Sequence, residues 1–536
     1  MATVTTPPTR RRPAAAAVLA ALAALAAGAI VLSSCGGSSN EAKPTEIAAT
    51  AAPSAPAASP SASASASAVA TVPAADLKLL KFTPDKGGGG TTVTVTGEGL
   101  PANKDAEFMW VTVDGSYDMT ATSENIQFNK RVFKEKRISV GKAKTGADGK
   151  LSATFATPED YGEVHDVFLT VDGKDVGRAG FRIMRQVSIS PESGPIGTPI
   201  TINVTGLGWT QFTNTMAVRY DNLPTGIITA VTTRGTTIAS IRASGGVGKH
   251  VLDIGHGARG LPFLNNQQSG TANIPDWRFT FTVTDAKTMP LDTLEFPDPA
   301  RLGTNTQAAP ITTVSGKPVS STMKGTFSPA SGPILTSTTL NATGAPANAD
   351  VELFFVSARG NRVNPSGWSL TETSLGKFKA GADGALKATV TIPDDLGGWH
   401  VISAVSSGAL LAEMPFFVEH SLLEVTPRQV KAGEQFTIHL KGIGWTELDN
   451  GVAITYDNAN IGFACGFNSN GDATVFLVAT GEPGIHLIDL YPMIYQGHGE
   501  PPWGYEEPLL SFKVDAPGLS LGYNLPTYRL AIEIVP

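Results

Sequence analysis

From residue 77 onward the chain alternates apolar and polar residues in short runs rich in Val, Thr, Ile and Phe. Residues 91–96, 200–204 and 436–440 are examples, and Gly, Pro, Asp and Asn separate such runs at short intervals. A period of two places every second side chain on one face of an extended chain, which predicts half-buried antiparallel strands. No stretch after residue 40 shows the period of an amphipathic helix. The pattern therefore indicates an all-β protein.

Asp-Gly pairs interrupt this pattern. Asp148-Gly149 and Asp383-Gly384 each stand before an alternating run, at residues 151–155 and 386–390. Asp-Gly tolerates the positive backbone angles of tight turns, so both pairs predict β-hairpins.

The chain also repeats itself at long range. Matches at a shift of 236 are Pro191 with Pro427, Gly197 with Gly433, residues 206–210 with 442–446, Tyr220-Asp221-Asn222 with Tyr456-Asp457-Asn458, and 250–253 with 486–489. Matches at a shift of 235 are residues 146–149 with 381–384, Pro158 with Pro393, and His165 with His400. A fixed shift over such a length indicates two copies of one two-domain module, in the order A-B-A′-B′.

The repeat predicts four domains, at residues 77–184 (A), 185–284 (B), 322–419 (A′) and 420–515 (B′). Each has room for about seven strands, which favours a two-sheet sandwich. Phe82-Thr83-Pro84 followed by residues 91–97 resembles the opening of bacterial immunoglobulin-like and IPT/TIG-type repeats, as do residues 187–206 and the text at 381–393. The resemblance implies four tandem immunoglobulin-like β-sandwiches, an architecture that serves many functions.

Three segments lie outside these domains. Residues 36–76 are nearly all Ala, Ser, Pro and Thr, which predicts a disordered tether. Residues 285–321 read as a Pro-containing linker whose Leu291, Leu294 and Phe296 suggest that part of it packs on a neighbouring domain. Residues 516–536 form a short C-terminal tail whose end has the pattern of one more strand.

The first 35 residues have the pattern of an export signal. Arg10, Arg11 and Arg12 precede an almost unbroken apolar run from residue 14 to 32, and small residues lead to Cys35. This end resembles the lipobox of bacterial lipoproteins, which implies that Cys35 is lipidated and becomes the new N-terminus. The alternative is an uncleaved transmembrane anchor, because 19 residues approach the length that spans a bilayer. Both interpretations place residues 36 onward outside the cell membrane, on the extracellular or periplasmic side.

Composition limits the classes of partner and the means of stabilisation that can be expected. Charged residues are 16% of the chain and the formal net charge is −7, so no basic face for nucleic acid is expected. Cys35 and Cys465 are the two cysteines. If Cys35 carries lipid, no intramolecular disulfide can form, and the domains must be stabilised by their apolar cores.

The B domains carry a repeated set of polar and aromatic residues. It comprises Trp209, Tyr220, Asp221 and His250 in B and Trp445, Tyr456, Asp457 and His486 in B′. An aromatic ring, a carboxylate and a histidine would suit a sugar or a metal. However, Trp fills cores, Asp-Asn forms turns, and His250 and Asp253 lie three apart on a strand, hence on opposite faces. We interpret the set as structural and expect neither metal nor cofactor.

The candidate ligand-binding segment is residues 491–505, which is rich in aromatic residues near carboxylates. Its residues are Tyr491, Tyr495, Trp503 and Tyr505, with Glu506 just beyond. Exposed aromatic rings beside carboxylates suit sugars or a protein partner. The alternative is a long loop that packs its rings on its own domain.

Catalytic signatures are missing from the chain: it has no Gly-x-Ser-x-Gly, no His-Glu-x-x-His and no phosphate-binding loop. The leading hypothesis is a non-enzymatic, lipid-anchored surface protein that acts in adhesion or as a spacer and binds a cell-wall polysaccharide or a surface protein. The alternatives are an accessory subunit of an envelope assembly or transport complex, and a secreted hydrolase with a site between domains.

Overall fold

The computed structural model describes residues 77–122, 125–258, 261–262, 264–268, 276–303, 322–360, 367–495 and 506–536. All of them belong to the unit Ala70–Pro536. The described residues form strands joined by loops and short 3₁₀ helices, and the strands build four pairs of sheets. The predicted fold class, all-β with tandem immunoglobulin-like sandwiches, is confirmed. The predicted signal sequence, including Cys35, and the predicted tether lie outside the described residues.

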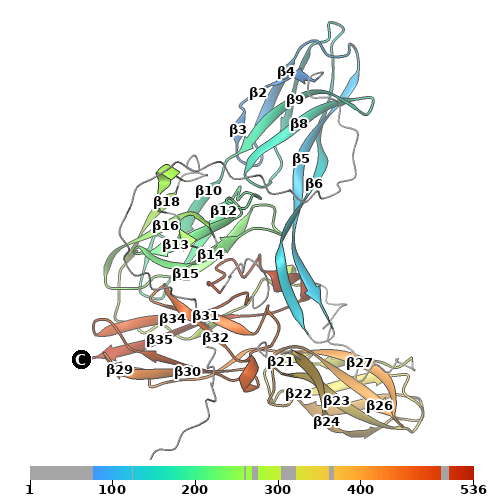
Figure 1. The fold of residues 1–536 in the computed structure, drawn as a ribbon, viewed down its shortest axis with the longest axis vertical. Helices are drawn as coiled ribbons and strands as arrows, with labels where there is room; N and C mark the ends of the chain where they lie inside the picture. Colours follow the sequence, from blue (N-terminus) through green and yellow to red (C-terminus); the bar gives the residue numbers. More distant parts are fainter. Residues whose placement is uncertain are drawn as a thin grey trace, which may run out of the picture. The chain divides into compact units, whose positions relative to one another are not determined.

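Domain A pairs a six-stranded sheet, in the order β1-β9-β8-β5-β6 with β3 beside β9, with the three-stranded sheet β2-β4-β7. Its strands are β1 (Lys78–Leu79), β2 (Lys81–Thr83), β3 (Lys86–Gly87), β4 (Thr92–Gly97), β5 (Asp105–Ala121), β6 (Ile126–Lys144), β7 (Leu151–Ala156), β8 (Glu163–Val171) and β9 (Lys174–Ile183). β5 and β6 continue as a long hairpin past the strands beside them (Figure 1).

Domain B pairs the three-stranded sheet β10-β12-β15 with a six-stranded sheet in the order β11-β18-β16-β13-β14, with β17 beside β16. Its elements are β10 (Gln186–Ser190), β11 (Ser193–Gly194), β12 (Pro199–Thr205), β13 (Thr215–Tyr220), β14 (Leu223–Thr229), β15 (Thr237–Arg242), β16 (Gly248–Ala258), β17 (Leu261–Pro262), the 3₁₀ helix Asn266–Gln268 and β18 (Trp277–Val283).

Domain A′ pairs the three-stranded sheet β20-β22-β25 with the five-stranded sheet β21-β27-β26-β23-β24. Its strands are β20 (Lys324–Ser328), β21 (Ser331–Gly332), β22 (Ser337–Thr343), β23 (Asp350–Gly360), β24 (Trp368–Lys379), β25 (Leu386–Thr391), β26 (Gly398–Ser406) and β27 (Ala409–Val418).

Domain B′ pairs the three-stranded sheet β28-β30-β33 with a six-stranded sheet in the order β19-β35-β34-β31-β32, with β29 beside β35. Its elements are β19 (Thr293–Glu295), β28 (Ser421–Thr426), β29 (Gln429–Lys431), β30 (Gln435–Lys441), β31 (Gly451–Tyr456), β32 (Ala459–Cys465), the 3₁₀ helix Phe467–Ser469, β33 (Ala473–Val478), β34 (Gly484–Pro492), the 3₁₀ helix Pro517–Leu521 and β35 (Thr527–Val535).

The C-terminal tail is an integral part of domain B′. β35 pairs with β34 on one side and with β19 and β29 on the other. Placing the end of this domain at residue 515 therefore left out one of its inner strands. The linker contributes β19 through backbone pairing, followed by the 3₁₀ helix Pro299–Arg301, while the Leu291 side chain stays 86% exposed.

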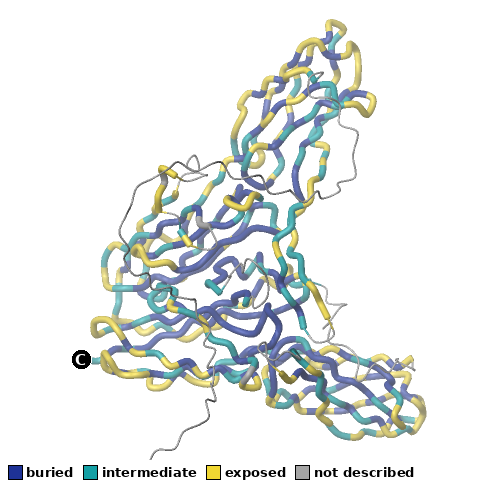
Figure 2. The backbone as a smooth tube through the Cα atoms, in the orientation of Figure 1, coloured by how far each residue is buried: buried dark blue, intermediate teal, exposed yellow. Residues whose placement is uncertain are grey.

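The four domains share one plan because the same sequence pattern recurs in each. A cis proline follows the first strand of each three-stranded sheet, and a two- or three-residue strand then pairs in parallel with the last strand of the other sheet. The cis bonds are Thr83-Pro84, Ser190-Pro191, Ser328-Pro329 and Thr426-Pro427. Apolar residues from the facing sheets fill each sandwich, so buried positions line the inside of each domain (Figure 2).

The Asp-Gly pairs form turns but not hairpins. Gly149 and Gly384 have φ of 71° and 75°, as the turn requires. The strands on either side belong to different sheets, because β6 pairs with β5 while β7 pairs with β4, and β24 pairs with β23 while β25 pairs with β22. The predicted hairpins are therefore wrong: each turn carries the chain from one sheet of the sandwich to the other.

The long hairpin of domain A contacts domain B′. The backbone N–H of Phe128 donates to Glu447 Oε2 at 2.8 Å, and the N–H of Glu447 donates to the Ile126 carbonyl at 3.1 Å. Ile126 and Phe128 are buried in an apolar cluster with residues of the other three domains, among them Ile227, Phe417 and Leu448. The four sandwiches are therefore not independent bodies.

Gly397 is expected to tolerate no side chain. A Cβ built there would lie 1.6 Å from the Gly442 carbonyl oxygen, where domain A′ meets domain B′. Because that atom is backbone, Gly397→Ala must shift the junction, and we expect it to lower the free energy of unfolding by about 1–3 kcal/mol. Urea denaturation followed by tryptophan fluorescence measures the loss. Gly246→Ala is the control, since its Cβ meets nothing within 4 Å; a change there equal to that at Gly397 would contradict the explanation.

Candidate functional site

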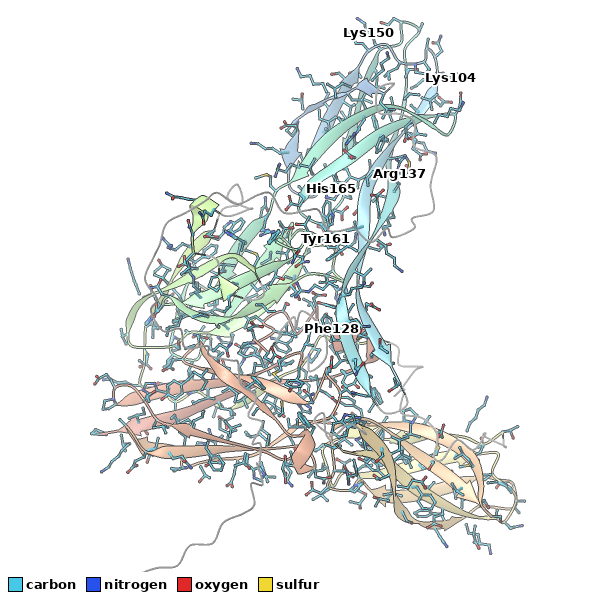
Figure 3. The ribbon with its side chains drawn as sticks, in the orientation of Figure 1. Lys104, Phe128, Arg137, Lys150, Tyr161 and His165 are labelled. Atoms are coloured by element: carbon cyan, nitrogen blue, oxygen red, sulfur yellow. The ribbon has the colours of Figure 1, made fainter. Side chains whose placement is uncertain are left out.

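The two repeated tryptophans lie where each A domain meets its B domain. The Trp209 ring centroid is 4.9 Å from that of His165, and the Trp445 centroid is 5.1 Å from that of His400. Trp445 is fully buried. His165 is held in place because its ring nitrogens lie 2.8 Å from the carbonyls of Val111 and Tyr161. Figure 3 labels His165 and Tyr161. These tryptophans therefore lie at the domain junctions, where each packs against a histidine of the neighbouring domain.

The repeated Tyr, Asp and His come together in domain B. His250 Nδ1 lies 2.6 Å from Asp221 Oδ2, and the two rings of Tyr220 and His250 stack at 5.5 Å. The remaining polar atoms also have partners, since His250 Nε2 lies 2.8 Å from the Gly246 carbonyl and the Tyr220 hydroxyl donates to the Ser244 carbonyl at 2.9 Å.

Domain B′ repeats the same geometry. His486 Nδ1 lies 2.6 Å from Asp457 Oδ2, whose other oxygen accepts from the Leu487 N–H at 2.9 Å. The Tyr456 hydroxyl donates to the Thr480 carbonyl at 2.8 Å. In domain B the triad joins the turn after β13 to the start of β16, and in domain B′ it joins the turn after β31 to the start of β34. This arrangement is what a structural role requires.

The pair Asp457–His486 gives a prediction about charge. Burial opposes protonation of His486, but the hydrogen bond and the negative charge of Asp457 outweigh it and raise the pKa of His486 above its ordinary value. The pair therefore stabilises the fold fully below about pH 6.5, and this contribution is lost as pH rises through the raised folded-state pKa. Asp457→Asn is expected to lower the pKa of His486, as measured by an NMR titration of the ring protons. Asp383→Asn, in an exposed turn, should leave it unchanged; equal values for all three proteins would contradict this assignment.

In domain B′ the triad lines a surface pocket of about 810 Å³, open space at its mouth included. Apolar side chains form much of its wall, and Leu223, the first residue of β14 of domain B, adds to it. The lining residues are Leu223, Tyr456, Asp457, Ala459, Ile461, Leu477, Val478, Thr480, Gly481 and His486. The pocket thus lies at the edge where β32 and β33, from the two sheets of the sandwich, come side by side.

Large apolar side chains on these two strands face solvent. Ile461 and Phe463 on β32 and Phe476 and Val478 on β33 are between 43% and 64% exposed. Four such residues on adjoining strands make an apolar patch of the kind that marks an interaction site. We call these four residues the B′ edge patch. Tyr495 borders it, with its ring centroid 6.1 Å from that of Phe463.

The predicted binding segment, residues 491–505, is only partly described. Tyr491 is fully buried, so its assignment to an exposed aromatic loop is wrong: it belongs to β34, where its hydroxyl lies 2.5 Å from Arg529. Tyr495 lies beside the B′ edge patch, and Glu506 is half-buried. Trp503 and Tyr505 lie outside the described residues.

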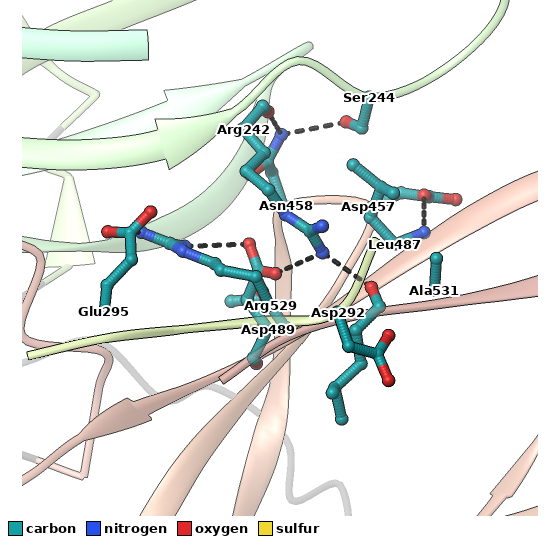
Figure 4. A network of polar contacts seen from close by, with 12 residues as sticks. Arg242, Ser244, Asp292, Glu295, Asp457, Asn458, Leu487, Asp489, Arg529 and Ala531 are labelled. Atoms are coloured by element: carbon teal, nitrogen blue, oxygen red, sulfur yellow. Dashed lines mark hydrogen bonds and ion pairs between the residues drawn. The ribbon is translucent and has the colours of Figure 1, made fainter. Parts of the chain in front are cut away.

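A buried ion network that sequence reasoning missed joins domains B and B′. Arg529 is 1% exposed and binds Asp489 Oδ2 at 2.9 Å, Glu295 Oε2 at 3.1 Å and the Ser240 carbonyl at 3.2 Å (Figure 4). Arg242 of domain B pairs with Asp489 and donates to the Leu530 carbonyl at 2.6 Å. Burial opposes the charge of Arg529, yet the neighbouring Tyr491, Asp489 and Glu295 raise its pKa above the ordinary value.

The repeat offered a signal for this network. Asp253 and Asp489 are matched positions, and each faces an arginine on the next strand, Arg278 in domain B and Arg529 in domain B′. Only the second pair is buried, because domain B covers it while the Arg278 side chain remains 71% exposed.

The described part of the chain shows neither a metal-ligand cluster nor a membrane-spanning helix. No group of three or more His, Cys, Asp or Glu residues there is arranged to hold a metal ion. Within the same residues, no helix has the length and apolar content needed to span a bilayer.

No family model and no curated protein matches the chain. Among solved structures, it aligns with the α-2-macroglobulin of E. coli at 11% identity and a TM-score of 0.16, over 84% of this chain and 30% of that chain. The Salmonella α-2-macroglobulin gives 11% identity, the same coverage and a TM-score of 0.17. A membrane anchored protein from Corynebacterium diphtheriae aligns at 11% identity and a TM-score of 0.17, over 63% of this chain and 89% of that chain. The chain spans less than a third of the macroglobulins, and at these TM-scores the likeness carries no argument about function.

Proposed function

We propose that this chain is a lipid-anchored, non-enzymatic binding protein of the bacterial cell surface, and that domain B′ binds a surface protein through its edge patch. The exposure of Ile461, Phe463, Phe476 and Val478 carries the proposal. Apolar side chains that remain in water on adjoining strands cost free energy unless a partner covers them.

The nature of the patch favours a protein over a polysaccharide. Its side chains are aliphatic or phenyl groups, which offer no hydrogen bonds to sugar hydroxyls, and apolar pockets rimmed by polar groups are typical of protein interfaces. The nearby Asp457 and His486 already bond to each other and to backbone groups. Their engagement supports a binding role without catalysis.

The proposal of a lipid anchor is supported by the sequence, in which Cys35 follows a stretch that resembles a lipoprotein export signal. The contacts between the hairpin of domain A and domain B′ argue against a spacer made of independent domains, because Phe128 and Glu447 join the first domain to the last. We therefore favour binding over spacing.

Photo-crosslinking on intact cells tests the proposal. Benzoylphenylalanine at position 461, in the edge patch, should give one discrete adduct with a surface protein. At position 238, an exposed apolar site on domain B, it should give none. For the anchor, we expect that Cys35→Ser is no longer labelled by metabolic palmitate and that the chain is released to the medium. Absence of any adduct at position 461 would overturn the binding role, and retention of Cys35→Ser in the membrane would overturn the lipid anchor.

A further inference from the structure

In domain B, a segment of domain B′ closes the edge that lies between β14 and β15. The Ile227 N–H donates to the Pro508 carbonyl at 2.9 Å, and the Leu510 N–H donates to the Ile227 carbonyl at 2.9 Å. The Leu510 carbonyl accepts from the Ser240 N–H on β15 at 3.2 Å. Leu509 therefore forms an isolated parallel β-bridge with Ile227, and residues 508–510 link the two sheets of the sandwich.

Side chains of this segment complete the core of domain B. Leu510 and Phe512 are each 1% exposed and belong to the same apolar cluster as Tyr220 and Ile228. The fit is close, since a Cβ built on Gly226 would lie 2.5 Å from the Pro508 carbonyl oxygen. Domain B thus reaches its closed form only with a strand that another domain donates.

The matched edge of domain B′ has the same backbone arrangement. Ala217 faces Ile227 in domain B and Ala453 faces Phe463 in domain B′, with a bulge at the same place in each hairpin. The N–H and C=O of Phe463 therefore point away from β31, as those of Ile227 point away from β13. Among the described residues, none forms a backbone hydrogen bond to them.

The side chains at matched positions of the two edges differ in polarity and in exposure to solvent. In domain B these positions are covered and at most 4% exposed, whereas in domain B′ they are apolar and at least 43% exposed. The pairs are Thr225 and Ile461, Ile227 and Phe463, Ser240 and Phe476, and Arg242 and Val478. Gly462, the match of Gly226, has nothing within 4 Å of its Cβ position. The pocket described above lies beside this edge and shares Ile461 and Val478 with the B′ edge patch.

We infer that the B′ edge binds an extended apolar segment of a partner protein by strand addition, in the way that domain B binds residues 508–510. This inference rests on the proposed function and names the mode of binding. Main-chain hydrogen bonds to Phe463 supply affinity, and apolar side chains of the segment enter the pocket between β32 and β33. Val478 in place of Arg242 removes the charge that domain B uses to pair with Asp489, so the partner segment is apolar rather than acidic.

A peptide with the sequence of residues 508–513 is the probe, because residues 508–510 already fill the matched edge and Phe512 packs in the core beside it. Added to the full-length chain, it should slow amide hydrogen exchange of Phe463 at least tenfold and leave Ile227 unchanged. Val478→Asp should weaken peptide binding at least tenfold, since it places a charge in the pocket. Leu335→Asp, at an exposed apolar site of domain A′, is the matched control and should bind as the parent protein does.

Three results would overturn strand addition. One is no protection of Phe463 at millimolar peptide. Another is protection of the Phe463 amide that increases with protein concentration, which would show that a second copy of the chain occupies the B′ edge. The third is binding of phosphatidylglycerol vesicles that competes with the peptide and marks a lipid surface. If crosslinking at position 461 still captures a surface protein while the peptide gives no protection, the proposed function stands and strand addition fails. If neither occurs, both fail.

Discussion

Replacing Arg529 with Met is expected to lower the free energy of unfolding of domain B′ by about 3–5 kcal/mol. The guanidinium is 1% exposed and pairs with Asp489 and Glu295, both largely removed from solvent. Met fills much of the volume but leaves the two carboxylates without their shared counter-charge. Burial opposes ionisation of Glu295, yet the charge of Arg529 is the leading reason that its pKa is lowered to about 2. The variant is therefore expected to raise that pKa as well.

Denaturant titration followed by circular dichroism measures the loss in Arg529→Met. Its matched control is Arg278→Met, which breaks the same cross-strand pair in domain B, where the arginine is exposed and Asp253 keeps Arg219 as a partner. Because exposed ion pairs contribute about 0–1 kcal/mol, the control should unfold close to the parent protein. Equal losses in the two variants would show that burial of the pair is not what matters.

Asp515→Ala is expected to destabilise the junction of domains A, B and B′ by about 3 kcal/mol, because it leaves several buried donors unpaired at about 1–3 kcal/mol each. The Asp515 carboxylate is fully buried. It accepts from the backbone N–H groups of Val231 and Thr232 at 2.8 Å and 2.9 Å, and from the Tyr117 hydroxyl at 2.9 Å. Tyr117 belongs to the long hairpin, so one side chain links three domains.

Thermal unfolding and hydrogen exchange of the Val231 and Thr232 amides measure the effect of Asp515→Ala. The control is Asp285→Ala, whose carboxylate also accepts from a backbone N–H and a hydroxyl but in an exposed turn. Water replaces those bonds, so a loss of about 1 kcal/mol or less is expected there. If Asp515→Ala left exchange at Val231 and Thr232 unchanged, the carboxylate would not be the link between these domains.

The alternation of apolar and polar residues was sufficient to predict the fold class. Runs such as residues 200–204 became strands with every second side chain buried, because one face of each sheet must pack against the other sheet. The tandem sandwiches followed from the long-range repeat, which places the same strands in the same order twice.

Contacts between distant parts of the chain were not predictable from local pattern. The Asp-Gly turns were recognised from residue type, but which sheet each flanking strand joins depends on pairing with β4 and β22 far upstream. The hairpin of β5 and β6 shows no local sign that its far end packs on Glu447. The sequence predicts an exposed Tyr491 because residues 491–505 are rich in aromatic residues near carboxylates, whereas β35 and domain B bury it.

The sequence identified the polar side of the pocket but assigned it a structural role, and it placed the binding site in residues 491–505 instead. Matching the two B domains identified Tyr456, Asp457 and His486, which the structure does bring together. The same alignment also contains the apolar positions of the B′ edge patch. Ser240 and Arg242 of domain B are replaced in domain B′ by Phe476 and Val478, a change from polar to apolar on the matched edge strands. The structure explains this change, because residues 508–510 bond to the edge of domain B and not to that of domain B′.

Amide hydrogen exchange in the free, full-length chain tests most directly whether the edge of domain B is closed and that of domain B′ is open. Ile227 and Phe463 occupy the same position on matched edge strands. We expect the Ile227 amide, which donates to Pro508, to exchange on the order of a hundredfold more slowly than the Phe463 amide. Equal protection of the two amides would mean that the edge of domain B′ is already occupied, and would contradict the account.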